Sequence, residues 1–474
     1  MADKMPPLGP PYGPAGPPPP PRFPERPPTE WGPRPIEDVP APPMPPPNDS
    51  RRRLAVIAGI IAAAVLLIGA VTVARSDDTK KTARPRNATT STAPGSNTDS
   101  SDASSSGSQS SDSSATASTG SQQLQQVVAD IERFVERERG LKFKADVPVE
   151  LLDGNEFNTE LFKGFEEEQP AIVEQAAVLK ALGLVAANRD LVADERELLS
   201  IGVEGFYDQK TKRLVVRGTD TTPLIRKVLA HELTHALDDQ WFNLDRPELD
   251  TADDESSFGF SALVEGNARV IEQAYYDKEL TSDEQQQSDA AEQEITTSAP
   301  QIFSLPLVLL VLLQAPYDSG TTLVQRLEQA SASRLDEAFA NPPLTSEQVI
   351  EPDKYLAGEG AVGVADPPPA DGSVPVYRGA LGVLLLQQLL ADGHSIDVTS
   401  IDDALKGWGG DRYVTWTDAG RTCIDDVVVG DDATATGTLL QRFQDWASSP
   451  GVTATVAPLS TEPGSPFAIT TCSL

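Results

Sequence analysis

The chain has 474 residues; residues 1–50 hold 21 of the 41 prolines, and residues 76–121 are mostly Ser, Thr, Asp and Gly. Neither segment can bury a hydrophobic core, so we expect a disordered proline-rich head, a disordered Ser/Thr-rich stalk and a folded part over residues 122–474. Residues 1–120 carry 12 Lys/Arg and 11 Asp/Glu, which leaves 26 and 60 on the rest and a net charge there of −34. Such a charge argues against nucleic-acid binding and against docking on an acidic membrane face.

An apolar run without charged residues lies between the two biased segments. Residues 54–74, LAVIAGIIAAAVLLIGAVTVA, form 21 residues, enough for a helix across a bilayer core of about 30 Å. We therefore predict a single transmembrane helix within residues 51–75; a cleaved signal peptide, the alternative, would lie nearer the N-terminus. The arginines at 51–53 abut this helix, and a stalk and a cysteine pair suit an oxidising space. We expect a cytoplasmic N-terminus and a C-terminal part outside the cell membrane.

The spacing of apolar residues predicts the first elements after the stalk. Residues 122–139 follow a helical period that ends at Gly140, residues 147–151 alternate as in a half-buried strand, and residues 169–184 indicate another helix. Residues 205–217 contain two short apolar runs around a polar turn, which is typical of a β-hairpin. This hairpin leads directly into the most informative segment.

A helix with two histidines follows the hairpin. Thr222 and Pro223 are typical of a helix start, and the apolar pattern continues to Gln240. Within this helix, the segment His231–His235 has the sequence HELTH, whose spacing places both imidazoles on one face. The HExxH pattern is typical of zinc sites, in which both histidines bind the metal and Glu232 is the general base. Two structural histidines on an ordinary helix are the alternative.

The residues that follow exclude one arrangement of the third ligand. The pattern HExxHxxGxxH would need glycine and histidine where this chain has Asp238 and Trp241, and the remaining histidine, His394, lies in a polar loop far along the sequence. Asp238 and Asp239 lie close to the histidines in sequence and are candidates for hydrogen bonds to them, with a solvated face as the alternative.

Glu265 is the better candidate for a third ligand. It lies in a predicted helix over residues 256–276 and is followed by Gly266 and Ala268, small residues that allow a second helix to pack closely against the first. A lone acid within an apolar sequence needs a partner if it is buried. We therefore predict that Glu265 joins His231 and His235; an exposed helix acid is the alternative.

These segments together resemble zinc metallopeptidases of the gluzincin type, in which a glutamate from a following helix joins HExxH. More closely, the chain is similar to membrane-anchored bacterial metallopeptidases of that type over roughly residues 130–420. The likeness includes the hairpin, LAHELTHAL at residues 229–237, LVEGNA at 263–268 and PYDSG at 316–320. It implies Zn²⁺ as the cofactor, peptides or proteins as substrates, and Glu232 as the base that takes a proton from the attacking water.

Gluzincins also have a tyrosine or histidine that stabilises the tetrahedral oxyanion, a role that requires a hydrogen-bond donor near the metal. The sequence leaves four candidates open, namely Tyr317, Tyr355, Arg412 and His394. Each of the four can equally have a structural role.

The predicted fold is α+β: a mainly helical, zincin-like domain with a small N-terminal sheet and helical packing downstream of the site. Residues 277–299 are long, polar and acidic and indicate a lid, an insertion or a solvated helix. Residues 305–313 are too short to span a bilayer and predict a buried helix. Cys423 and Cys472 are the two cysteines of the chain and can form one disulfide near its C-terminal end, with free thiols as the alternative.

Two other functions are compatible with the sequence. One is a catalytically inactive surface binding or scaffold module on the metallopeptidase fold, against which an intact Glu232 counts. The other is a metal-free interaction protein in which the proline-rich head is the functional part. Metal content separates this second function from the other two.

Overall fold

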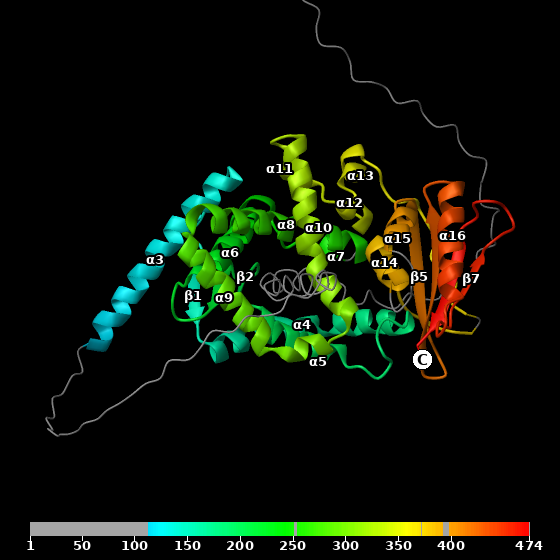
Figure 1. Ribbon diagram of the computed structural model, residues 1–474, viewed down its shortest axis with the longest axis horizontal. Coiled ribbons are helices and arrows are strands. Elements are labelled where there is room, and N and C mark those ends of the chain that lie inside the picture. The colour runs from blue at the N-terminus through cyan, green and yellow to red at the C-terminus, as the bar shows by residue number, and fades with distance from the viewer. Residues whose placement is uncertain (1–111, 251–253, 371, 392–397, 474) are drawn as a thin grey trace, which may run out of the picture. The chain divides into compact units, whose positions relative to one another are not determined.

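The computed structural model describes residues 112–250, 254–370, 372–391 and 398–473 (Figure 1). The predicted proline-rich head, the predicted transmembrane residues 54–74 and His394 lie outside the described residues. The described part is α+β, with many helices and two small sheets. Its first helix, α3 (Asp112–Arg139), includes the predicted helix over residues 122–139 but begins earlier, within the segment expected to be stalk.

The predicted hairpin is present and forms part of a three-stranded sheet. Strands β1 (Val149–Leu152), β2 (Gly205–Asp208) and β3 (Arg213–Arg217) have the order β1-β3-β2. β2 and β3 pair antiparallel, whereas β1 pairs with β3 in parallel. A parallel pair needs a crossover connection, and here helices α4 (Gly154–Ala181) and α5 (Leu191–Gly202) lie between β1 and the hairpin in the sequence. The helix predicted over residues 169–184 is the second half of α4.

Helix α6 (Pro223–Phe242) carries the two histidines and runs through the core. The Thr222 hydroxyl accepts a hydrogen bond from the backbone N–H of Ile225 at 3.3 Å, so the predicted helix start is confirmed. The helix ends where Asn243 adopts a φ of 54°, a left-handed value that asparagine tolerates well. Residues on every side of α6 are buried, because the three-stranded sheet and helices α3, α8 (Asp254–Glu279) and α9 (Ser282–Ser298) pack around it.

Helix α8 packs against α10 (Leu307–Ala330) at a pair of glycines. A Cβ added to Gly266 would lie 2.1 Å from the carbonyl carbon of Gly320, and one added to Gly320 would lie 2.0 Å from the carbonyl oxygen of Ala262. The two backbones are therefore in direct contact, which only glycine permits. This contact fixes the position of Glu265, one residue before Gly266.

Helix α10 is long and apolar enough to cross a membrane, as judged by length and composition alone, and it is the one such helix in the described part of the chain. Of its most apolar window, 44% is buried, and Tyr317, Leu323 and Leu327 lie in hydrophobic cores. A core helix passes the same test, so the composition is weak evidence of membrane association. The buried helix predicted over residues 305–313 is the start of α10, although Leu307 is 49% exposed.

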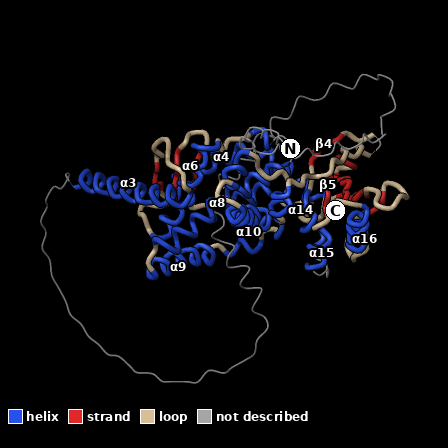
Figure 2. Tube along the Cα trace, turned by 90° about the horizontal axis from the view of Figure 1, so that it is seen from above, coloured by secondary structure: helices blue, strands red, loops and turns tan. Residues whose placement is uncertain are grey.

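Downstream of the site, the prediction of helical packing is wrong, because this region contains a second, five-stranded sheet (Figure 2). The strands have the order β4-β5-β6-β8-β7, and each neighbouring pair is antiparallel. Their bounds are β4 (Pro375–Gly379), β5 (Trp408–Asp418), β6 (Arg421–Gly430), β7 (Thr455–Pro458) and β8 (Phe467–Cys472). Cys423 on β6 lies directly opposite Cys472 on β8, and the predicted disulfide joins them.

The remaining helices connect or cover these elements. Helices α14 (Gly382–Ala391), α15 (Val398–Leu405) and α16 (Ala433–Ala447) contribute to the core of the second sheet. The shorter helices are α7 (Pro247–Asp250), α11 (Arg334–Ala340), α12 (Ser346–Ile350), α13 (Pro352–Ala357) and a 3₁₀ turn over Pro300–Ser304.

Candidate metal centre

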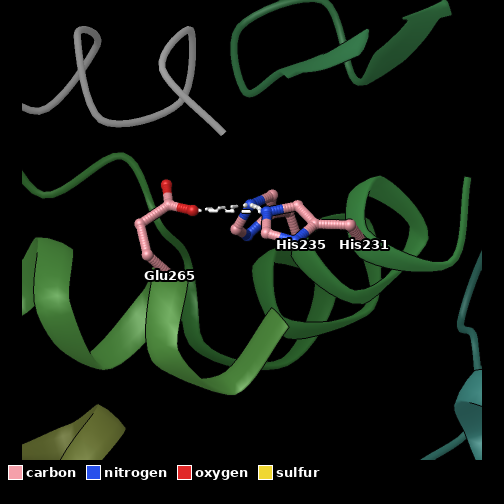
Figure 3. Close-up of side chains that lie close together, drawn as sticks. All are labelled: His231, His235 and Glu265. Carbon is pink, nitrogen blue, oxygen red and sulfur yellow. Dashed lines mark hydrogen bonds and ion pairs between the residues drawn. The ribbon is translucent and has the colours of Figure 1, made fainter. Parts of the chain in front are cut away.

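Three predicted ligands converge on one point inside the protein (Figure 3). His231 and His235 lie on successive turns of α6, and Glu265 extends toward them from α8. The two Nε2 atoms are 3.0 Å apart, and Oε2 of Glu265 lies 3.3 Å from Nε2 of His231 and 3.4 Å from Nε2 of His235. All three side chains are buried. The structure therefore brings together three side chains that could hold a metal ion.

These distances fit a small metal ion. A tetrahedral ion with bonds of about 2.0–2.1 Å to nitrogen and oxygen has its ligand atoms about 3.3–3.4 Å apart. The three observed separations of 3.0, 3.3 and 3.4 Å are close to that value. Oε1 of Glu265 also has no hydrogen-bond partner among the described residues, although it is buried. Two imidazoles and one carboxylate form a donor set typical of divalent transition metals.

Glu232 lies beside the three ligands in an environment that suits proton transfer. Its side chain is fully buried, and neither carboxylate oxygen has a hydrogen-bond partner in the part of the chain that the structure describes. Burial raises the pKa of Glu232, although the neighbouring His235 and His231 favour its charged form. The backbone N–H of Tyr207 also favours the charged form, at a geometry that falls short of a hydrogen bond. A buried carboxyl group with a raised pKa next to a metal site is a candidate general base.

The hairpin lies directly against this part of α6. A Cβ added to Gly205 would lie 3.4 Å from Cγ of Glu232 and 2.7 Å from a methyl group of Val228. Glycine at this position lets β2, which is at the edge of its sheet, closely approach the face of α6 that carries Glu232.

The other ring nitrogen of His231 binds a residue that sequence reasoning missed. Nδ1 of His231 lies 3.0 Å from Oε2 of Glu272, which is buried on α8. Glu272 follows Glu265 by seven residues, so both lie on one face of the helix; this spacing was the available signal. A carboxylate in this position fixes the tautomer and the orientation of the imidazole. Burial alone would lower the pKa of His231, but hydrogen bonds to Glu265 and Glu272 outweigh it and raise the pKa to about 10.

Two cations hold Glu272 in its ionised form. Nη1 of Arg269 lies 2.6 Å and Nζ of Lys227 lies 3.3 Å from its Oε1 atom. Burial opposes ionisation, but these cations, with His231, bring the pKa of Glu272 well below its usual range. Oε1 of Glu272 therefore contacts the cations, and its Oε2 contacts His231.

The two acids predicted to support the histidines position α6 instead. Asp238 accepts a hydrogen bond from Nε of Arg139 on α3 at 2.8 Å and another from the side-chain amide of Asn267 on α8. Asp239 accepts a hydrogen bond from the Tyr207 hydroxyl at 2.8 Å. These bonds tie α6 to three neighbouring elements. Nδ1 of His235 has no hydrogen-bond partner among the described residues.

Of the four candidates for oxyanion stabilisation, the structure brings Tyr317 to the site. Its ring stacks on that of His231 at a centroid distance of 6.2 Å, and its buried hydroxyl has no hydrogen-bond partner within the described ranges. The Tyr355 hydroxyl instead donates to the backbone carbonyl of Asn341 at 2.7 Å. Arg412 lies on β5, where its Nε donates to Asp366 at 2.9 Å.

A second group of acids has metal-like spacing but contains its own cation. Glu347, Glu359 and Asp431 come within 4.8 Å of one another. Nζ of Lys354 lies 2.6, 2.7 and 2.9 Å from their carboxylate oxygens, respectively. The ammonium group lies among the three carboxylates, where a metal ion would have to bind, so the cluster is an ion-pair network and not a metal site.

A cavity of about 430 Å³ lies between α8 and α10. Its lining includes Arg269, the partner of Glu272, but none of the three metal-ligand side chains. The other lining residues are Val270, Gln273, Ala274, Asp277, Lys278, Asp318, Thr321 and Gln325.

No protein-family model, no curated protein and no solved structure matches this chain. The resemblance to gluzincins consequently depends on the short segments quoted above.

Proposed function

We propose that the protein is a zinc-dependent peptidase of the gluzincin type, anchored in the cell membrane by residues 54–74 with residues 122–474 outside the cytoplasm. One observation carries the proposal: the ring-nitrogen and carboxylate-oxygen atoms of His231, His235 and Glu265 are 3.0–3.4 Å apart, next to the buried carboxylate of Glu232, which has no hydrogen-bond partner among the described residues. A purely structural metal site has no need of such an acid. Zn²⁺ is the ion that best suits two imidazoles and a carboxylate.

Zinc bound by these ligands would activate water and polarise a substrate carbonyl. Glu232 accepts the proton that the attacking water loses and later donates a proton to the leaving amine. Its raised pKa suits both tasks, because a stronger base accepts the proton more readily and still releases it in the second step. The Tyr317 hydroxyl donates a hydrogen bond to the oxyanion of the tetrahedral intermediate.

The position of β2 supports a peptide as the substrate. An extended peptide can add to the edge of a sheet through main-chain hydrogen bonds, without requiring a particular side-chain sequence. β2 is an edge strand, and Gly205 brings it against Glu232. A peptide bound along β2 would therefore present a carbonyl group close to the general base.

The test uses the full-length chain in detergent. We expect about one zinc per chain by elemental analysis, much less in Glu265→Ala, and cleavage of a peptide library by the wild type. Glu232→Gln is expected to retain zinc and lose cleavage, whereas Glu294→Gln, which changes an exposed acid on α9, is expected to retain both.

The outcomes separate the competing functions. A folded wild-type chain that takes up no zinc would refute the peptidase. A chain that binds zinc but cleaves no member of the library, with wild type and Glu232→Gln indistinguishable, would favour the inactive surface module.

A further inference from the structure

We propose that helix α9 tunes the metal ligand His231 through a relay of buried charges, in which Glu292 is a positioning residue. The inference depends on the metal site proposed above. Oε1 of Glu292 lies 2.6 Å from Nζ of Lys227, which lies 3.3 Å from Oε1 of Glu272. Oε2 of Glu272 in turn lies 3.0 Å from Nδ1 of His231. The relay connects α9 to the metal centre through α6 and α8.

The members of this relay are shielded from water. The side chains of Lys227, Glu272 and His231 are 6%, 7% and 3% exposed, and that of Glu292 is 22% exposed. Charges that are buried to this extent are screened much less than surface pairs, so the removal of one of them changes the electrostatic energy of its neighbours. Lys227 also precedes His231 by one helical turn, which places both side chains on the same face of α6.

Glu292 controls how strongly Lys227 acts on Glu272. The ammonium group lies closer to Glu292 than to Glu272, at 2.6 Å against 3.3 Å. Glu272 already has a closer cation in Arg269, at 2.6 Å. Without Glu292, Glu272 would be the one acidic partner left to Lys227 among the described residues, and Lys227 would draw negative charge away from the oxygen that faces His231.

This change in the charge on Glu272 would affect the metal through the imidazole of His231. A carboxylate that accepts the Nδ1 proton of a histidine makes Nε2 a better metal ligand, so a weakened carboxylate makes it a poorer one. The unbalanced charge of Lys227 would also repel a divalent cation. Both effects have the same sign, and both lower the affinity of the site for metal.

Helix α9 provides a matched control. Arg226 of α6 pairs with Glu284 of α9, so this pair joins the same two helices as Lys227 and Glu292. Glu284 closes the capping box of α9 with Thr281, a role that glutamine also performs. Glu284→Gln thus removes one charge from the α6–α9 contact while Lys227, Glu272 and His231 stay unchanged.

The experiment compares four full-length chains: wild type, Glu292→Gln, Glu284→Gln and the double variant Lys227→Met/Glu292→Gln. Zinc affinity is measured by competition with a chelator, and the visible spectrum of the Co²⁺-loaded protein reports the ligand field. Loss of a direct partner of a metal ligand costs about 10- to 100-fold in affinity, so we expect about 3- to 10-fold for the more distant Glu292. Glu284→Gln is expected to match the wild type in affinity and spectrum.

The double variant separates electrostatic tuning from simple docking of α9. If Lys227 is the charge that Glu292 balances, its removal restores affinity to within about twofold of the wild type. The proposal is overturned if Glu292→Gln binds zinc like the wild type, or if its loss of affinity persists in the double variant. A wild-type chain without zinc would overturn the metal site itself, whereas a zinc-binding wild type that Glu292→Gln matches would overturn the relay alone.

Discussion

Gly320→Ala is expected to separate helices α8 and α10 and to disturb the proposed metal centre that they support. The added Cβ would lie 2.0 Å from the carbonyl oxygen of Ala262 and 3.1 Å from Cα of Gly266. Both obstacles are backbone atoms, so no side-chain rotation relieves the overlap. Glu265 precedes Gly266 directly, and Tyr317 lies one turn before Gly320.

The size of the effect follows from the overlap. Relief of a 2.0 Å approach to an ordinary contact of about 3.2 Å requires a shift of about 1 Å between the helices, and overpacking of this kind costs about 1–3 kcal/mol. A ligand set must be held within about 0.5 Å of its productive geometry, so we also expect at least about a tenfold loss of metal affinity. Urea unfolding measures the first quantity and chelator competition the second.

Gly437→Ala is the matched control. Gly437 is exposed on α16, and nothing lies within 4 Å of an added Cβ. Alanine there is expected to stabilise the protein by about 0.5–1 kcal/mol, because glycine loses more conformational freedom in a helix. A Gly320→Ala protein that unfolds within about 0.5 kcal/mol of the wild type, with full metal affinity, would refute the close contact of α8 and α10.

Three further outcomes are expected. Tyr317→Phe should lower kcat by about 10- to 1000-fold with little change in KM, because its hydrogen bond forms in the transition state. A raised KM with an unchanged kcat would contradict that role. Burial, with the charge of Asp194, raises the pKa of Glu195 to about 8 from 4.5, so the folded state loses stability as the pH rises from about 4.5 to 8. Glu195→Gln should flatten that slope in a pH series of urea unfolding and stabilise the protein by up to about 3 kcal/mol at pH 7. Replacing Cys423 and Cys472 by serine should cost about 4 kcal/mol in the same assay, since the bridge closes a loop with a sequence separation of 49, and unchanged stability would contradict the disulfide.

The ligand helix could be predicted because its signals are contiguous. The cap at Thr222, the apolar pattern and the HELTH motif all fall within one helix, so no tertiary information was needed. Glu265 could be found from its small neighbours, because closely packed helices need small residues such as glycine and alanine at their contact. Glu272 was harder to assign: its seven-residue spacing from Glu265 places it on the same helix face, but an acid near other charged residues has the same pattern whether it faces solvent or His231.

The second sheet was missed for a related reason. Gly407–Gly410 has the composition of a turn, yet Trp408–Asp418 is a strand. A Cβ added to Gly409 would lie 2.6 Å from the backbone of Gly430 on the next strand. The glycine therefore allows the two strands to approach each other closely. Local composition cannot distinguish this use of glycine from a chain reversal, because the partner strand lies elsewhere in the sequence.

The order of the second sheet affects how the protein is made. β8 is inserted between β6 and β7, although it follows both in the chain. As the polypeptide emerges from the ribosome or crosses a membrane from its N-terminus, β6 can pair with β5, but β7 and the other edge of β6 have no partner strand until residues 467–472 arrive. Closure of this sheet is therefore a late event in biosynthesis, whereas α6 and α8, which bear the proposed metal ligands, have by then already emerged. A ribosome that stalls shortly before β8 would release a chain with both ligand helices but with an exposed, unpaired strand edge for quality control to recognise.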